Sequence, residues 1–191
     1  MAGPNGSGKT TILRAVQNKY FSGPYVNADD IEKSLRLNKV LDLAVSFGLH
    51  ISCRDFSGFL RKQGTSWKVK ADLEKASIGM LCRRGKLISK EMPSAYDAAL
   101  IADFIRHQFL KAKQTFTFET VLSHPSKIEF IKAAKATGYK NYLYFICTND
   151  PSINVSRVRE RVKKGGHSVP LEKIGKRYFE SLCKLPSVSN V

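Results

Sequence analysis

The first ten residues, MAGPNGSGKT, contain the residue types that bind nucleotide phosphates. Gly3, Gly8, Lys9 and Thr10 are spaced as in the P-loop pattern G-x-x-x-x-G-K-[ST]. In such a loop the backbone N–H groups surround a phosphate, the lysine reaches the β- and γ-phosphates, and the threonine hydroxyl binds Mg²⁺. The sequence therefore predicts a site for ATP and Mg²⁺.

The residues predicted to bind the nucleotide in this loop are Gly3, Pro4, Asn5, Gly6, Ser7, Gly8, Lys9, Thr10 and Thr11. The alternative is an ordinary glycine-rich turn before a helix, which we consider weaker because strands and helices alternate downstream. A transporter-type ATPase is excluded because the chain lacks an L-S-G-G-Q segment and four apolar residues followed by Asp-Glu.

A P-loop connects a buried strand to a helix, and the apolar periodicity after Lys9 predicts that helix over 9–20. Only Met1 and Ala2 precede Gly3. We therefore expect the first strand of the fold to be missing from this chain, and the C-terminal KLPSVSNV to stop early as well.

The remaining pattern alternates between strands and helices. We expect short strands over 25–28, 115–119 and 139–147, the last buried on both faces, and helices over 31–37, 94–113, 125–137, 152–164 and 171–182. This order predicts an α/β protein with a mostly parallel sheet, of the three-layer P-loop NTPase type.

Residues 39–90 differ in character, with eleven Lys and Arg against four Asp and Glu and several interrupting glycines. Their short apolar runs fit strands or helices equally well. We interpret 39–90 as an insertion or subdomain within a single domain of 191 residues.

The net charge of +16 predicts attraction to polyanions, whether nucleotides, nucleic acid or acidic surfaces. The basic residues come in ones and twos, so nucleic acid is the less favoured partner. No apolar run of membrane-spanning length and no signal-peptide pattern is visible, and no membrane partner is expected. The four cysteines are scattered without a C-x-x-C spacing, which argues against a zinc site or a disulfide framework and favours the cytoplasm.

Several motifs together resemble the zeta-toxin-like P-loop kinases, in the branch usually called predicted ATPases. They are AGPNGSGKTT, VNADDIEKSL, the run from FTFET through GGHSVP, and IGKRYFESL, which cover roughly residues 1–37 and 94–185. The resemblance implies an ATP-dependent kinase that transfers the γ-phosphate to a hydroxyl of a small molecule. The best-known members phosphorylate UDP-N-acetylglucosamine and act as toxins that a partner antitoxin neutralises.

The resemblance also implies catalytic roles for two carboxylates. Asp29 would be the base that accepts the proton of the acceptor hydroxyl. Its neighbour Asp30 is an alternative, although capping the following helix is the simpler role for it. Glu119, at the end of the FTFET strand, would lie near the metal and the acceptor; otherwise it is a strand-end residue facing solvent.

Arg157 and Arg161 are four residues apart and share one face of the helix expected over 152–164. By resemblance, Arg161 is a lid arginine that compensates phosphate charge in the transition state, and Arg157 binds the nucleotide unless it belongs to a solvated face. His167 occupies the position of a second lid arginine, where neutral imidazole is a weaker counter-charge. Arg177 is a further candidate contact.

The acceptor stays open, because the basic segment 39–90 replaces the interval that forms the sugar-nucleotide pocket in the family. Two other functions are also open. One is a nucleotide- or nucleic-acid-binding module without catalysis, and the other is a truncated, inactive relative.

Overall fold

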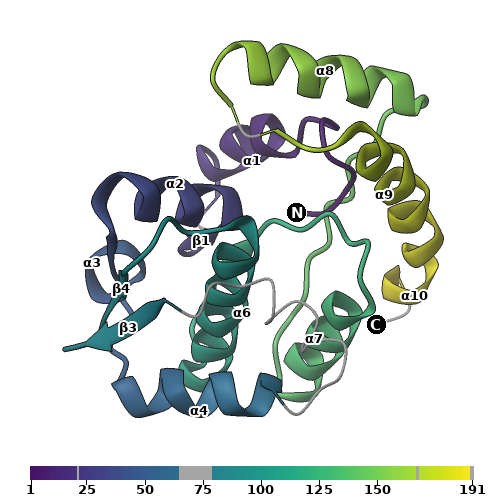
Figure 1. Cartoon of the computed structure of the whole chain (residues 1–191). Helices are drawn as coiled ribbons and strands as arrows, with labels where there is room; N and C mark the ends of the chain where they lie inside the picture. The colour runs from purple at the N-terminus through teal and green to yellow at the C-terminus, as the bar shows by residue number, and fades with distance from the viewer. Residues whose placement is uncertain (21, 65–78, 167, 190–191) are drawn as a thin grey trace. The chain divides into compact units, whose positions relative to one another are not determined.

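The computed structural model describes residues 1–20, 22–64, 79–166 and 168–189, in two compact units (Figure 1). The P-loop unit consists of Met1–Phe21 and Glu119–Val191. The central unit consists of Ser22–Phe118. The chain therefore leaves the P-loop unit after its first helix and returns to it at Glu119.

The described helices of the P-loop unit are α1 (Lys9–Gln17), α7 (Pro125–Ala136), α8 (Pro151–Lys163), α9 (Leu171–Lys184) and α10 (Pro186–Ser189). Local sequence explains where they begin. Asp150 accepts a hydrogen bond from the backbone N–H of Ser152 and Pro151 opens α8, while His124 and Pro125 do the same for α7. The helices expected over 9–20, 125–137, 152–164 and 171–182 are thus confirmed, with shifted ends.

Ala2 lies between two other segments of the P-loop unit, with parallel bridges to Thr120 and Phe145. Its N–H donates to Tyr144 O at 2.8 Å, and its carbonyl accepts from Ile146 N at 2.9 Å. On the other side, Gly3 N donates to Thr120 O at 3.2 Å and Thr120 N donates to Met1 O at 3.0 Å.

The strand expected over 139–147, buried on both faces, is wrong. Within the described chain these residues form one bridge, at Phe145, and Tyr142 is 76% exposed. A strand needs neighbours along its whole length to satisfy its backbone groups. The only described bridge partner here is Ala2, so an apolar composition alone does not produce a strand.

In the central unit, β1 (Tyr25–Val26) pairs in parallel with β5 (Thr117–Phe118), a confirmed but shorter form of the two expected strands. Asn27 then caps α2 (Ala28–Asn38), and a Ser94–Asp97 capping box starts α6 (Ala95–Ala112). The two helices pack around a core that includes Val26 and Phe104, both fully buried. Asn27 is the N-cap itself, and Asp30 lies in the first turn of α2, where a carboxylate favours the helix dipole.

In its described residues, 39–64 and 79–90, the segment 39–90 forms an antiparallel sheet with strand order β2-β4-β3, together with two helices. The described elements are β2 (Val40–Asp42), α3 (Leu43–Phe47), α4 (Cys53–Gly64), β3 (Met80–Arg83) and β4 (Lys86–Ser89). Phe56 and Phe59 of α4 contact Phe104 of α6, with ring centroids 5.1 and 5.4 Å apart. The segment therefore shares the core of the central unit.

The chain is a mixed α/β protein with a small parallel sheet and helices, which is compatible with a P-loop NTPase-like fold. The expectation of a mostly parallel sheet needs correction for the described residues, because the three-stranded antiparallel sheet is larger than the parallel β1–β5 pair. None of the described helices has the length and apolar character needed to cross a membrane.

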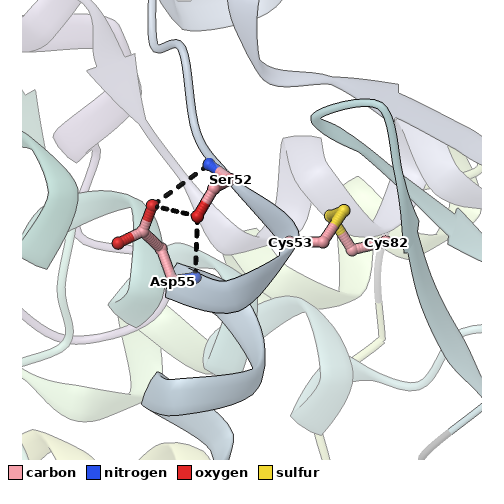
Figure 2. The surroundings of a disulfide bond; sticks show 4 residues. All are labelled: Ser52, Cys53, Asp55 and Cys82. Atoms are coloured by element: carbon pink, nitrogen blue, oxygen red, sulfur yellow. Dashed lines mark hydrogen bonds between the residues drawn. A yellow bond between two sulfur atoms is a disulfide. The ribbon is translucent and has the colours of Figure 1, made fainter.

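A disulfide joins Cys53, at the start of α4, to Cys82 of β3 (Figure 2). The Cα atoms are 5.3 Å apart, within the usual range for a disulfide. The argument from cysteine spacing against a disulfide framework missed this bond, because the two residues are 29 positions apart and only the folded chain brings β3 next to α4. Cys147 and Cys183 are exposed and not disulfide-bonded.

We expect the substitution Cys53→Ser to lower the free energy of unfolding by about 3 kcal/mol, because the cross-link restricts the unfolded chain. Urea unfolding under oxidising conditions measures the loss, and a reductant should lower the wild-type value by a similar amount. The double variant Cys147→Ser, Cys183→Ser is the control and should respond to the reductant as the wild type does. The prediction is contradicted if the reductant leaves the free energy of unfolding of the wild type unchanged.

Candidate phosphate-binding site

The P-loop turns directly into α1, with Gly8 as the N-cap at φ 98°. No described side chain caps this helix, and among its first residues the N–H of Thr11 bonds to Gly8 O, so the N–H of Thr10 is left for a ligand. A helix N-terminus of this kind favours an anion, because the N–H groups and the helix dipole act together. The loop is therefore arranged as a phosphate site.

Gly6 packs against α8 so closely that no side chain fits. A Cβ atom at this position would lie 2.6 Å from the backbone oxygen of Asn154, and φ is +79°. Both the contact and the left-handed backbone require glycine. The middle of the P-loop is thus fixed by contact with the first turns of α8.

Lys9 is buried beneath the loop, with 5% of its surface exposed. Its ammonium donates to Gly3 O at 2.9 Å and to Pro4 O at 2.8 Å, and lies 3.5 Å from Glu119 Oε1. A buried charge needs such partners to offset the loss of water. The lysine therefore already lies at the loop, as the P-loop pattern predicts.

Glu119 lies in the middle of the sequence, and its side chain contacts Lys9 and Thr10 near the start of the chain. It comes directly after β5, its side chain is 16% exposed, and its Oε2 accepts a hydrogen bond from Thr10 Oγ1 at 3.2 Å. Hydroxyl and carboxylate oxygens are ligands that Mg²⁺ prefers, usually together with substrate phosphates. No group of three or more His, Cys, Asp or Glu among the described residues forms a metal site of its own. Thr10 and Glu119 fit a Mg²⁺ ion shared with a nucleotide better than a protein-only site.

The loop also contains a buried hydroxyl that lacks a partner. Ser7 is 5% exposed, and its Oγ accepts or donates no hydrogen bond to any described residue. A buried polar atom without a partner is costly, so native structures usually supply one. A hydroxyl donor in this position fits a phosphate oxygen, and the residues present therefore fit a bound nucleotide.

Arg157 and Arg161 of α8 lie in different surroundings. The exposed Arg157 reaches the loop, since a Cβ atom on Gly8 would lie 3.9 Å from its Nη1. Arg161 packs instead against Gly166, whose N–H donates to Arg161 O at 2.9 Å. His167 lies outside the described residues. The structure thus brings Arg157 to the loop, while Arg161 lies beside Gly166, just after the end of α8.

Asp29 belongs to the central unit, where it is the second residue of α2. It is exposed, and its N–H donates to Asn27 Oδ1 at 3.0 Å. Its role as catalytic base stays a prediction. Thr11 is exposed on the first turn of α1, so its part in nucleotide binding stays a prediction too.

Asn154 is a residue that the sequence analysis missed. It is fully buried, and its Nδ2 donates to Asn5 O at 2.6 Å. A signal was present: Asn154 lies four residues before Val158, so the two share one helix face, and a polar residue on a buried face needs a polar partner.

Comparison with known proteins supports this picture for the second half of the chain. A model of the family described as Zeta toxin matches residues 94–187, which include Glu119 and the whole of α8. This segment is zeta-toxin-like. The matched range leaves out the P-loop and Asp29. The resemblance of the sequence to zeta toxins is therefore confirmed, over the part of the chain that follows the insertion.

A curated relative from Haemophilus influenzae is described as an uncharacterized protein. It is 35% identical over 82 residues, which are 43% of this chain and 59% of the relative. The chain thus spans about three fifths of the length of the relative that it matches. No solved structure matches the chain significantly.

We expect Gly6→Ala to destabilise the P-loop unit more than Gly138→Ala does. Both glycines have positive φ, 79° and 93°, but a Cβ atom on Gly138 meets nothing within 4 Å. Gly138→Ala should cost about 1 kcal/mol of backbone strain, and Gly6→Ala about 2 kcal/mol more because of the collision with Asn154. Urea unfolding measures both free energies, and equal losses would show that α8 does not hold the loop.

Proposed function

We propose that the chain is a P-loop phosphotransferase of zeta-toxin type, which binds ATP with Mg²⁺ and transfers the γ-phosphate to a hydroxyl of a small molecule. The observation that carries the proposal is the meeting of Lys9, Thr10 and Glu119 beside a glycine loop. The zeta-toxin match supports it, because that family is kinase-like.

In this proposal the chain's own groups bind and orient the nucleotide. The backbone N–H groups of the loop, the Ser7 hydroxyl and the Lys9 ammonium bind phosphate oxygens. Thr10 and Glu119 hold Mg²⁺, and Arg157 adds positive charge, which its planar guanidinium can share between two phosphate oxygens. The bound ATP supplies the phosphoryl group, and Mg²⁺ neutralises the charge that develops on it.

Further parts of the proposal rest on the resemblance. Asp29 acts as the base toward the acceptor hydroxyl, and Arg161 and His167 belong to a lid that covers the phosphates. The fold is the three-layer P-loop type, with 39–90 as an insertion in a single domain, in the predicted-ATPase branch. The acceptor belongs to the class of nucleotide-sugars such as UDP-N-acetylglucosamine, and an antitoxin is the protein partner. The cytoplasm is the proposed location, which comes from the sequence analysis and not from the resemblance.

We expect Mg-ATP to raise the thermal stability of the protein. At a free concentration of one hundred times Kd, the gain is about 2.7 kcal/mol. Lys9→Met should abolish the shift in melting temperature, since it removes the ammonium that binds the phosphates. Lys163→Met is the matched control: this lysine is 72% exposed on α8 and pairs with Glu160, so the shift should persist. A wild type with no shift would remove the proposal of nucleotide binding.

We expect Asp29→Asn to abolish phosphoryl transfer while nucleotide binding persists. An amide cannot accept the hydroxyl proton, and loss of a general base typically costs about 10²- to 10⁴-fold in rate. Radiolabelled ATP with a panel of nucleotide-sugars and metabolites measures the product, and the Mg-ATP melt of the same variant is the control. Unchanged transfer would contradict the role of Asp29.

The net charge of +16 favours a second candidate, a nucleic-acid-binding module without catalysis. Fluorescence anisotropy with random-sequence RNA and DNA over a range of salt concentrations tests it, because phosphate contacts make affinity fall steeply with salt. The absence of binding at physiological salt would remove this candidate.

A further inference from the structure

We infer that Asn154 is a positioning residue for the P-loop, which sets the direction of the Gly6 N–H by holding the carbonyl of Asn5. The inference rests on the proposed function, in which that N–H belongs to the phosphate-binding backbone.

The side-chain amide of Asn154 is fixed by a partner at each end. Its Nδ2 donates to Asn5 O at 2.6 Å, and its Oδ1 accepts from the hydroxyl of Thr148. A backbone carbonyl can only accept, so the nitrogen of the amide must face Asn5. The Thr148 hydroxyl lies at the other end of the amide, and its single proton is shared between Asn154 Oδ1 and the carbonyl of Asp150, 3.0 Å away.

Holding one end of a peptide bond also fixes the other end. A trans peptide is planar, and its C=O and N–H point in opposite directions. The bond from Asn154 to Asn5 O therefore turns the Gly6 N–H away from Asn154. Without that bond the Asn5 carbonyl could rotate toward the phosphate site, where its partial negative charge would repel an anion.

The surroundings make Asn154 a rigid support. It is fully buried, and its backbone oxygen would lie 2.6 Å from a Cβ atom on Gly6. The carbonyl of Thr148 accepts a hydrogen bond from the hydroxyl of Tyr178 on α9, at 2.7 Å. The support thus joins the P-loop to α8, to α9 and to the segment that follows Phe145.

Asn154 also couples the loop to a second group of the site. Arg157 lies three residues later, so the two side chains are neighbours on the surface of α8. One of them holds the loop at Asn5, and the other brings a guanidinium toward Gly8. A single helix therefore sets both the shape of the loop and a positive charge beside it.

The test compares the binding of ADP with that of AMP, because only ADP has the phosphate that the loop binds. In a P-loop the glycine-rich backbone surrounds the β-phosphate, which ADP has and AMP lacks. A residue that merely stabilises the fold changes the affinities for Mg-ADP and AMP alike. A residue that positions the Gly6 N–H changes the affinity for Mg-ADP selectively.

The decisive variant is Asn154→Asp, which has nearly the same shape and places a carboxylate oxygen against the Asn5 carbonyl. Isothermal titration calorimetry should show an affinity for Mg-ADP lowered by about tenfold or more, with the affinity for AMP changed by less than about twofold. The matched control is Asn141→Asp, because the Asn141 amide also donates to a backbone carbonyl, that of Ile131 at 3.0 Å, away from the loop. Its affinities should equal those of the wild type.

Two substitutions at Thr148 decide the question if Asn154→Asp does not fold. Thr148→Val removes the hydroxyl that orients the amide and should weaken Mg-ADP selectively, by less than Asn154→Asp. Thr148→Ser keeps the hydroxyl and should restore wild-type binding.

The possible outcomes separate this inference from the proposed function. A wild type that binds neither nucleotide overturns the proposed function. A wild type that prefers Mg-ADP, with variants that keep the same ratio of ADP to AMP affinity, overturns the positioning role alone. A selective loss in Asn154→Asp or Thr148→Val, with restoration in Thr148→Ser, supports it.

Discussion

The backbone hydrogen bonds around Ala2 are the constraint on which the P-loop unit depends. Residues 1–3 bond on one side to the segment at Thr120 and on the other to the segment from Tyr144 to Ile146. These contacts align three pieces of chain that are about 120 and 25 residues apart in sequence. Because Ala2 is fully buried, no water competes for its bonds. Glu119 reaches Lys9 and Thr10 because its segment is held at this point.

The same backbone hydrogen bonds also place the carboxylate of Glu119 near Lys9. Glu119 precedes the residue bonded to Met1 and Gly3, so its carboxylate meets Lys9 and Thr10 on the adjacent stretch of chain. The backbone beyond it is held in an uncommon state: Leu122 is fully buried with φ 60°, and its N–H donates to Thr120 Oγ1 at 3.0 Å. A bulky residue in the left-handed region costs about 1 kcal/mol or more, so the surrounding contacts must impose it. The turn after Glu119 is therefore rigid, which suits a carboxylate that must stay near the loop.

The sequence predicts the local features of this structure better than the long-range ones. The loop, Lys9, Thr10 and the helix starts at Asp150 and Ser94 depend on neighbouring residues, and motif spacing and capping signals reveal them. The Zeta toxin match supports, over residues 94–187, the resemblance that rested on several motifs together. The failures are all long-range. Residues 139–147 have the composition of a strand, but strand formation depends on a neighbour elsewhere in the chain. Cys53 and Cys82 pair because β3 folds back on α4, which no spacing rule records.

Asn154 shows why sequence analysis can find one residue of a site and miss its neighbour. Arg157 is noticeable because charge near a phosphate motif has an obvious chemical use, whereas a single asparagine inside a helix does not. Yet both contribute to the same arrangement from neighbouring positions of α8, and the less noticeable one is fully buried while the arginine is exposed. Burial makes the difference in role: an exposed guanidinium can move toward a ligand, whereas a buried amide with two fixed partners can only hold what it touches. The P-loop of this chain is therefore shaped by contacts from α8 as well as by its own glycines.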